Sequence, residues 1–448
     1  MLSILKIFIR NLNFSFLRQN KNVSIMEMFH DDFTIIKFFS FRMNFLLEDY
    51  HHHRITKSYE TLKLSTWITI KLWTLILLLI LITFCPTNNW LVDCKFFEQI
   101  LQVQRIDLIF VEVIVISFIE EWLWLFFLQE ALTYNCQYLN FITFDFPDDH
   151  QKMNLKMKKY LNKYFSIVKF STYFSYLFVI LFSIILWILI IFENFISYQN
   201  ENIFFIQFLT NIPFLTLLFM SLTYMTGQFF ASGSFLLCCL IFFLQKLKQL
   251  RMIALSLSSY TTNETSKLVN KRFWNEFHDP YIILYKRISK LNESAKVILV
   301  GMEMIAKFVI MSSCVFFSQQ IKMNWSNLFI VILGIVVFLC VSVVYMSIAT
   351  LPTYNEQCFR YILRWLIQSQ TQSSIRTKRS KFYSRFFKQI QFRLLIKANL
   401  FAQTMVNNQL GFTCGHLFHI NKYKFTELIL MNIPLILLLY KHASHYEN

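Results

Sequence analysis

Long apolar stretches alternate along the chain with polar, mostly basic segments. A helix of about 20 apolar residues spans the ~30 Å hydrocarbon core of a bilayer. Stretches of about this length or longer, and one shorter final stretch, are predicted to be transmembrane helices: 67–85, 106–128, 170–192, 213–245, 296–317, 326–350 and 425–440. The pattern therefore predicts an all-α, polytopic membrane protein with seven transmembrane helices.

The fourth stretch is too long for one perpendicular crossing. We interpret it as a single helix, 213–250, that starts at Pro213 and continues beyond the membrane, because proline suits the first helical position. The alternative, two crossings at 203–225 and 229–245, would place all later basic segments on the outer side. At the sixth stretch, Leu351–Pro352 is predicted to end the helix.

Composition and charge set the orientation. The chain of 448 residues is 56% hydrophobic and only 15% charged, against ~25% charged in soluble domains. Its net charge of +17 comes from segments between the apolar stretches, so membrane topology explains it and a nucleic-acid partner is not expected. Segments 1–66, 129–168 and 246–295 hold nine, five and nine Lys/Arg, and 353–410 is also strongly basic. Segments 87–105, 194–212 and 318–325 hold two, none and one.

Positively charged loops stay on the cytoplasmic side. This asymmetry predicts a cytoplasmic N-terminus, an extracellular C-terminus and a multi-pass protein of the plasma membrane in contact with membrane lipids. Four regions are expected: a cytoplasmic segment 1–66, a six-helix ligand-binding bundle 67–350, a cytoplasmic amphipathic anchor 351–424, and a last helix with a short outer tail, 425–448.

The last apolar stretch carries polar residues where a lipid-facing helix needs none. Asn432, Ile436 and Tyr440 follow at intervals of four and share one helical face, with Leu439 beside it. Such a face suits an apolar constriction that gates a pore by dewetting. Asn432, Ile436, Leu439 and Tyr440 are therefore pore-lining candidates, and a helix–helix contact is the alternative.

A charged pair lies at membrane depth in the fifth stretch. Glu303 and Lys307 are four residues apart in the favourable order for a helical ion pair. The pair is either purely structural or places Lys307 beside a ligand cavity near Glu112, which lies in the second stretch. Bulky, adaptable side chains in the outer halves of neighbouring stretches could line that cavity or simply pack against lipid and helices: Trp187, Phe219, Met220, Tyr224 and Met311.

The sequence contains no recognisable catalytic or metal-binding pattern. The nine cysteines show no metal-ligand spacing, and the histidines at 51–53 have no partner cluster nearby. Cys85 and Cys94 either pair or remain free thiols. We find no phosphate-binding or nucleophile motif, so we expect no enzyme activity, no cofactor and no metal.

The architecture and the terminal stretch resemble the arthropod gustatory/odorant receptor superfamily, and its gustatory branch in particular. That branch has a glycine-containing lead-in, then a final helix with T-Y, five hydrophobic residues and Q-F. Here the lead-in is GFTCGHLFHINKYKF, and the helix has Asn432-Ile433, then PLILL, then Leu439-Tyr440. Asn432 occupies the place of the family's Thr, and Leu439 that of its Gln.

The resemblance implies a chemosensory receptor that acts as a ligand-gated, non-selective cation channel. It implies a homo- or hetero-tetramer with related receptor subunits, a small-molecule chemical ligand bound among helices two to six, and a central pore lined by the seventh helices. The alternatives are a G-protein-coupled-type receptor, a membrane transporter and a structural membrane protein without a ligand. A G-protein-coupled receptor would require the opposite orientation, in which the sequons at Asn263 and Asn292 are outside.

Overall fold

The computed structural model describes Trp73 and residues 114–126, 155–199, 205–259, 272–318, 325–379, 385–408 and 410–432, in places by the backbone alone. The elements are α10 (Leu155–Gln199), α11 (Phe205–Ser259), the π-helix η3 (Phe273–His278), α13 (Asp279–Ser318), α14 (Trp325–Arg379), α15 (Arg385–Asn407), β1 (Thr413–Cys414) and β2 (Phe418–His419). Residues 114–126 and 422–432 are also helical. The predicted all-α class is confirmed for these residues, with one small β-hairpin added.

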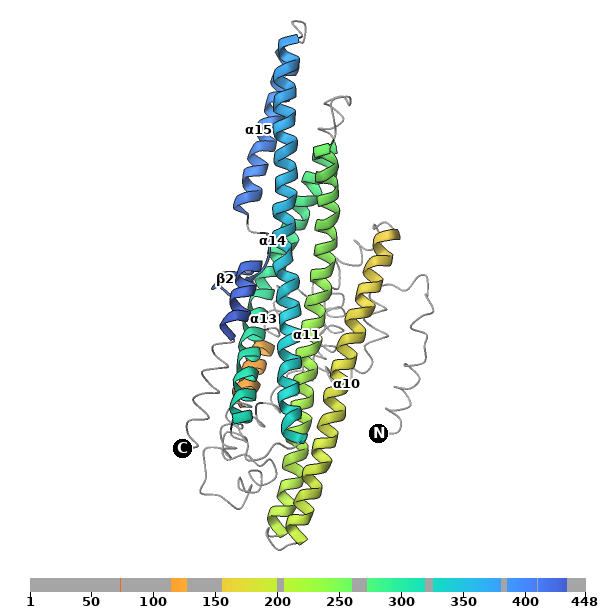
Figure 1. Ribbon diagram of the computed structural model, residues 1–448, viewed down its shortest axis with the longest axis vertical. Coiled ribbons are helices and arrows are strands. Elements are labelled where there is room, and N and C mark those ends of the chain that lie inside the picture. The colour runs from red at the N-terminus through yellow and green to blue at the C-terminus, as the bar shows by residue number, and fades with distance from the viewer. Residues whose placement is uncertain are drawn as a thin grey trace, which may run out of the picture.

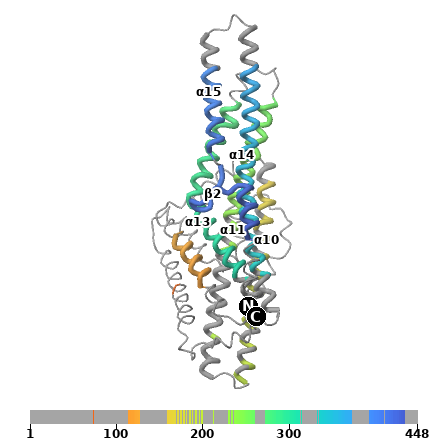
Figure 2. The backbone as a smooth tube through the Cα atoms, turned by 60° about the vertical axis from the view of Figure 1, so that its left-hand side comes forward, coloured from red at the N-terminus to blue at the C-terminus, as the bar shows by residue number. Residues whose placement is uncertain are grey.

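The helices form an elongated bundle around α11 and α14 (Figure 1). Each of these two helices has 55 residues, which corresponds to a length of about 80 Å. They run in the same direction and pack extensively on each other, with α10 against α11 and α13 against α14. Beyond this four-helix region, α15 runs back along the second half of α14 (Figure 2). The second halves of α11 and α14 thus extend past α10 and are accompanied there by η3, the start of α13 and α15.

The fourth apolar stretch is one continuous helix, as predicted, but its predicted start is wrong. α11 begins at Phe205 and continues to Ser259, so Pro213 lies in its third turn. A proline there leaves only one backbone carbonyl without its helical donor, and the long apolar sequence on both sides maintains the helix. The prediction relied on a local preference of proline for the first turn and ignored the apolar residues that precede it.

The predicted end of the sixth helix at Leu351–Pro352 is also wrong. α14 continues through Pro352 to Arg379. Ile348, Leu351 and Cys358 on either side of the proline are completely buried. The Thr353 hydroxyl bonds to the Ala349 carbonyl at 3.4 Å, one position from the carbonyl that loses its donor. Tertiary packing therefore outweighs the local cost of the proline.

One stretch among the described residues, Gly334–Thr371, is long and apolar enough to cross a membrane. It supports a membrane location and overlaps the predicted sixth span. The seven crossings and the orientation of the termini stay predictions. Cys85, Cys94 and the histidines at 51–53 lie outside the described residues.

Aromatic side chains hold the far end of the bundle together, where η3, the start of α13, α14 and α15 meet. The Phe273 ring is fully buried and stacks on Trp365 with 4.5 Å between ring centres. Phe401 of α15 packs edge-on against Phe273, Phe277 and Tyr281. The Tyr281 hydroxyl donates to Asn355 Oδ1 at 2.8 Å. We call the aromatic residues at this end the aromatic cluster: Phe273, Trp274, Phe277, Tyr281, Trp365 and Phe401.

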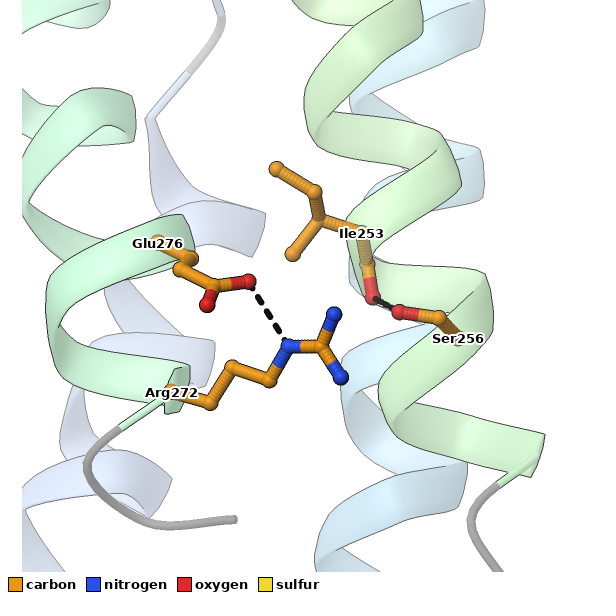
Figure 3. A network of polar contacts seen from close by, with 4 residues as sticks. All are labelled: Ile253, Ser256, Arg272 and Glu276. Carbon is orange, nitrogen blue, oxygen red and sulfur yellow. Dashed lines mark hydrogen bonds and ion pairs between the residues drawn. The ribbon is translucent and has the colours of Figure 1, made fainter. Parts of the chain in front are cut away.

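The π-helix that carries the cluster also packs against α11. Arg272, the residue before η3, donates from Nε to Glu276 Oε2 at 2.7 Å. Figure 3 shows the Arg272 guanidinium between η3 and the turn of α11 that carries Ile253 and Ser256. Within that turn the Ser256 hydroxyl donates a hydrogen bond to the Ile253 carbonyl at 2.8 Å. η3 is absent from the sequence prediction.

Candidate functional site

A short β-hairpin precedes the last helix. Thr413 pairs with His419 and Cys414 with Phe418 in antiparallel register. Gly415 adopts a φ of 58°, a left-handed conformation that favours glycine, in the turn between the strands. The Ile420 N–H closes the hairpin by donating to the Phe412 carbonyl at 2.9 Å. We call residues 410–420 the base hairpin.

Hydrogen bonds fix the base hairpin to α13. The Thr413 N–H donates to Asn292 Oδ1 at 2.8 Å, and Asn292 Nδ2 donates to Thr413 Oγ1 at 3.2 Å. The Gly415 N–H donates to the Lys296 carbonyl at 3.0 Å. A Cβ atom at Gly415 would lie 2.7 Å from Val300 Cγ2, so the backbone approaches α13 too closely for a side chain.

The other side of the hairpin meets α14. A Cβ atom at Gly411 would lie 2.7 Å from His419 Nε2 and 3.3 Å from Pro352 Cγ. The Tyr345 hydroxyl lies 3.5 Å from Cys414 Sγ and donates to the Leu299 carbonyl at 3.0 Å. Tyr345 and Cys414 are both 2% exposed. One tyrosine of α14 thus joins the hairpin to α13.

The charged pair of α13 lies next to this contact. Lys307 Nζ is 3.2 Å from Glu303 Oε1, which confirms the predicted ion pair. Both charges influence the Cys414 thiol electrostatically, so they lie near the hairpin. Burial raises the pKa of the Cys414 thiol above its ordinary value, because the thiolate would be poorly solvated there.

The last helix starts directly from the base hairpin. Asn421 is its N-cap, since Asn421 Oδ1 accepts the Lys424 N–H at 2.8 Å and the Asn421 carbonyl accepts the Phe425 N–H at 2.9 Å. Lys424 and Glu427 form an ion pair at 2.7 Å in the first turns. The helix therefore starts one turn before the predicted span at 425, with no flexible linker between it and the docked hairpin.

The pore-lining candidates are only partly described. Asn432 is 7% exposed, and Leu428, one turn earlier on the same face, packs against the core. The opposite side of the helix carries Leu430 and Met431, which are 57% and 66% exposed. Ile436, Leu439 and Tyr440 lie outside the described residues.

The ligand-binding candidates lie on three helices. Trp187 is half-buried on α10, and Lys307 and Met311 are half-buried on α13. Phe219, Met220 and Tyr224 belong to α11, which packs against both of those helices and whose backbone alone is described at these positions. Glu112 lies outside the described residues. The helices that carry the described candidates are neighbours, but the grouping of the side chains into one ligand site stays a prediction.

Sequence reasoning missed the hairpin, its docking residues and the cap. The signals were present: Gly411 and Gly415 flank a short polar stretch before the last helix, and Asn421 stands just before it. The partners Asn292 and Tyr345, by contrast, are 121 and 69 residues distant in sequence from the hairpin positions they contact. No local pattern identifies them.

No family model matches the sequence, and no curated protein matches it. Eight chains of solved structures match its fold. One is the insect olfactory receptor OR5 from Machilis hrabei in complex with eugenol, with a TM-score of 0.49 and 12% sequence identity over 83% of this chain and 88% of that chain.

Proposed function

We propose that the chain is a chemosensory receptor of the gustatory-receptor-like type that acts as a ligand-gated, non-selective cation channel. One observation carries the proposal: the last helix has its first turn fixed, through the base hairpin, to α13 and α14. A displacement of those helices by a ligand would move the last helix with them. A receptor that opens a pore with its last helix needs such a connection.

The proposed roles of the candidate residues follow from this geometry. Glu112, Trp187, Phe219, Met220, Tyr224, Lys307 and Met311 bind a small organic ligand around α11. Asn432, Ile436, Leu439 and Tyr440 belong to the pore helix. Because Asn432 is covered by its own bundle, it holds the closed helix in place, and Ile436, Leu439 and Tyr440 form the apolar constriction. A ligand that shifts α13 releases this contact and lets the constriction hydrate.

The apolar surface of the extended end supports assembly into a tetramer. On α15, Phe392, Ile396 and Leu400 are exposed at intervals of four, while Ala398, Phe401 and Ala402 face the aromatic cluster side of the helix and are buried. The predicted topology places α15 in the cytoplasm, where an exposed apolar stripe suits a contact with another subunit.

The structure offers a direct test of the orientation. Asn292 belongs to an Asn-x-Ser sequon, but its amide is bonded to Thr413 on the side that we place in the cytoplasm. Glycosylation would disrupt that contact, so the protein expressed in eukaryotic cells should carry no glycan at Asn292. A glycan detected there by mass spectrometry would contradict the topology.

The function itself is tested by ion flux. Purified protein is reconstituted in liposomes that contain a cation-sensitive dye, and a panel of small volatile and taste compounds is added. We expect at least one compound to start cation uptake, and Met311→Ala to weaken its apparent affinity. A matched variant at an exposed position of the same helix, Ile283→Ala, should respond like the wild type. Absence of compound-dependent uptake across the panel would contradict the proposal.

A further inference from the structure

Two basic residues of α11 face tyrosine rings instead of acids. Lys248 Nζ lies 5.9 Å from the ring centre of Tyr160 and 5.5 Å from that of Tyr354. The guanidinium carbon of Arg251, one turn further, lies 5.6 Å from the Tyr354 ring centre. The ion pairs found in the described part of the chain all involve other residues. The cationic charge of Lys248 and Arg251 is therefore not neutralised by a described carboxylate.

Arg251 also retains an unused donor. Its Nε–H is shielded from solvent and has no hydrogen-bond acceptor among the residues that the structure describes. A buried N–H without an acceptor is costly, and one on a charged group especially so. An oxyanion from outside the chain would supply the acceptor.

The surrounding elements build a defined site. Tyr160 comes from α10, Lys248 and Arg251 from α11, and Tyr354 from α14, three helices that pack on one another. Burial and the neighbouring Tyr164 and Tyr354 raise the pKa of Tyr160 to about 12. The phenol stays neutral at physiological pH, so the site keeps the charge of its two cations.

The predicted topology places the site at the depth of lipid headgroups. Both helices continue further, but the apolar sequence that predicts the fourth and sixth spans stops at 245 and 350, so Lys248, Arg251 and Tyr354 follow the predicted membrane core by about 4 to 9 Å of helix. A headgroup layer is roughly 6 Å thick on each side of the bilayer. From Tyr160 toward the membrane, α10 exposes Ile167, Phe170 and Phe174, an apolar surface against which an acyl chain fits.

We propose that Lys248 and Arg251, framed by Tyr160 and Tyr354, bind the phosphate of an anionic lipid headgroup in the inner leaflet. Arginine binds phosphate oxygens through parallel N–H groups, and lysine adds a flexible point charge. Basic pockets between helices on the cytoplasmic side of a membrane suit anionic headgroups. The inference requires that the chain crosses the membrane but not that it conducts ions.

The test measures the thermal unfolding midpoint of the full-length protein in neutral detergent. Short-chain phosphatidylinositol bisphosphate is titrated against phosphatidylcholine of the same chain length, and inositol trisphosphate and inorganic phosphate form two further arms. The variant Lys248→Gln/Arg251→Gln removes both cations. The control Lys286→Gln/Lys290→Gln removes the same charge from exposed positions of α13, and Lys248→Arg/Arg251→Lys preserves the charge of the site.

We expect the anionic lipid, and not phosphatidylcholine, to raise the unfolding midpoint of the wild type. Lys248→Gln/Arg251→Gln should need about 30-fold more lipid for the same rise. The control should respond like the wild type, and the charge-preserving variant should fall between the two because Arg251→Lys removes the Nε–H donor. An equal loss in both glutamine variants would show diffuse electrostatic attraction and overturn the site. Inositol trisphosphate or phosphate acting as strongly as the lipid would overturn the assignment to a membrane lipid.

Discussion

The aromatic cluster and the base hairpin hold the same helices together by different means. In the cluster, Phe273, Phe277 and Trp365 are packed by apolar contacts that depend little on direction. Around the base hairpin, Asn292, Gly415 and Tyr345 make hydrogen bonds and close backbone contacts that depend strongly on direction. The first arrangement suits a static anchor. The second suits a joint that transmits small displacements of α13 and α14 to the last helix.

Removal of a cluster ring should have the largest effect on stability. Trp365 is 6% exposed and stacks on Phe273, so Trp365→Ala leaves a cavity that costs about 3 to 5 kcal/mol. The thermal unfolding midpoint of the purified protein should fall by many degrees. Ile283→Ala, at an exposed position of α13, should leave it nearly unchanged, and equal losses in both variants would refute the anchor role.

Gly415→Ala tests the joint. An alanine must adopt the left-handed conformation, which costs roughly 1 to 2 kcal/mol, and its Cβ must displace Val300. Compound-dependent cation uptake should fall much more than the unfolding midpoint does. The matched control is Gly233→Ala in α11, where a Cβ meets only Met302 Cε at an ordinary 3.4 Å. If both variants conduct like the wild type, the hairpin does not transmit the signal.

Asn292→Ala should have an intermediate effect. It removes the acceptor of the Thr413 N–H and the donor to Thr413 Oγ1, two part-buried bonds. A fully buried group left unpaired costs about 1 to 3 kcal/mol, so the cost here should lie toward the lower end of that range. Asn292→Asp keeps the acceptor and should recover part of the uptake. The check is the concentration of compound that gives half-maximal uptake. An Asn292→Asp variant no better than Asn292→Ala would indicate that the Thr413 N–H contact is unimportant.

The smallest effect should come from pH. Burial raises the pKa of the Cys414 thiol in the folded protein above its unfolded value. The associated stability is therefore complete below the unfolded pKa of about 8.5 and declines as pH rises above it. Alkylation of Cys414, followed by mass spectrometry at pH 8, should be slow in the folded protein and fast in denaturant. Rapid alkylation of the folded protein would show that the hairpin is not docked.

Features that depend on neighbouring residues could be predicted from the sequence, and features that depend on residues far apart in the chain could not. Apolar stretches of helical length predicted the long helices, and i, i+4 spacing predicted the Glu303–Lys307 pair, because both depend on neighbours in sequence. The continuation of α14 through Pro352 depends on packing around Ile348 and Leu351, which outweighs a local rule. The docking of Thr413 on Asn292 joins positions 121 residues apart, for which one sequence contains no signal.

The candidate site also contains both features with a local sequence signal and features without one. Asn421 is a cap that local sequence could have revealed, whereas the burial of Asn432 depends on the whole bundle. The roles of Ile436, Leu439 and Tyr440 follow from helical periodicity and from the resemblance of the terminal stretch, and they stay predictions. The ligand-binding candidates were chosen by residue type, which contains no information on which helices pack together, and their common site stays a prediction.

The central claim is that last helices from several copies of the chain surround one pore. Single-particle imaging of the full-length protein in lipid nanodiscs tests it most directly. We expect a particle with fourfold symmetry, with the helix that follows the base hairpin next to the axis and α15 at the contacts between subunits. A monomeric particle, or an assembly whose last helices face lipid at the periphery, would contradict it.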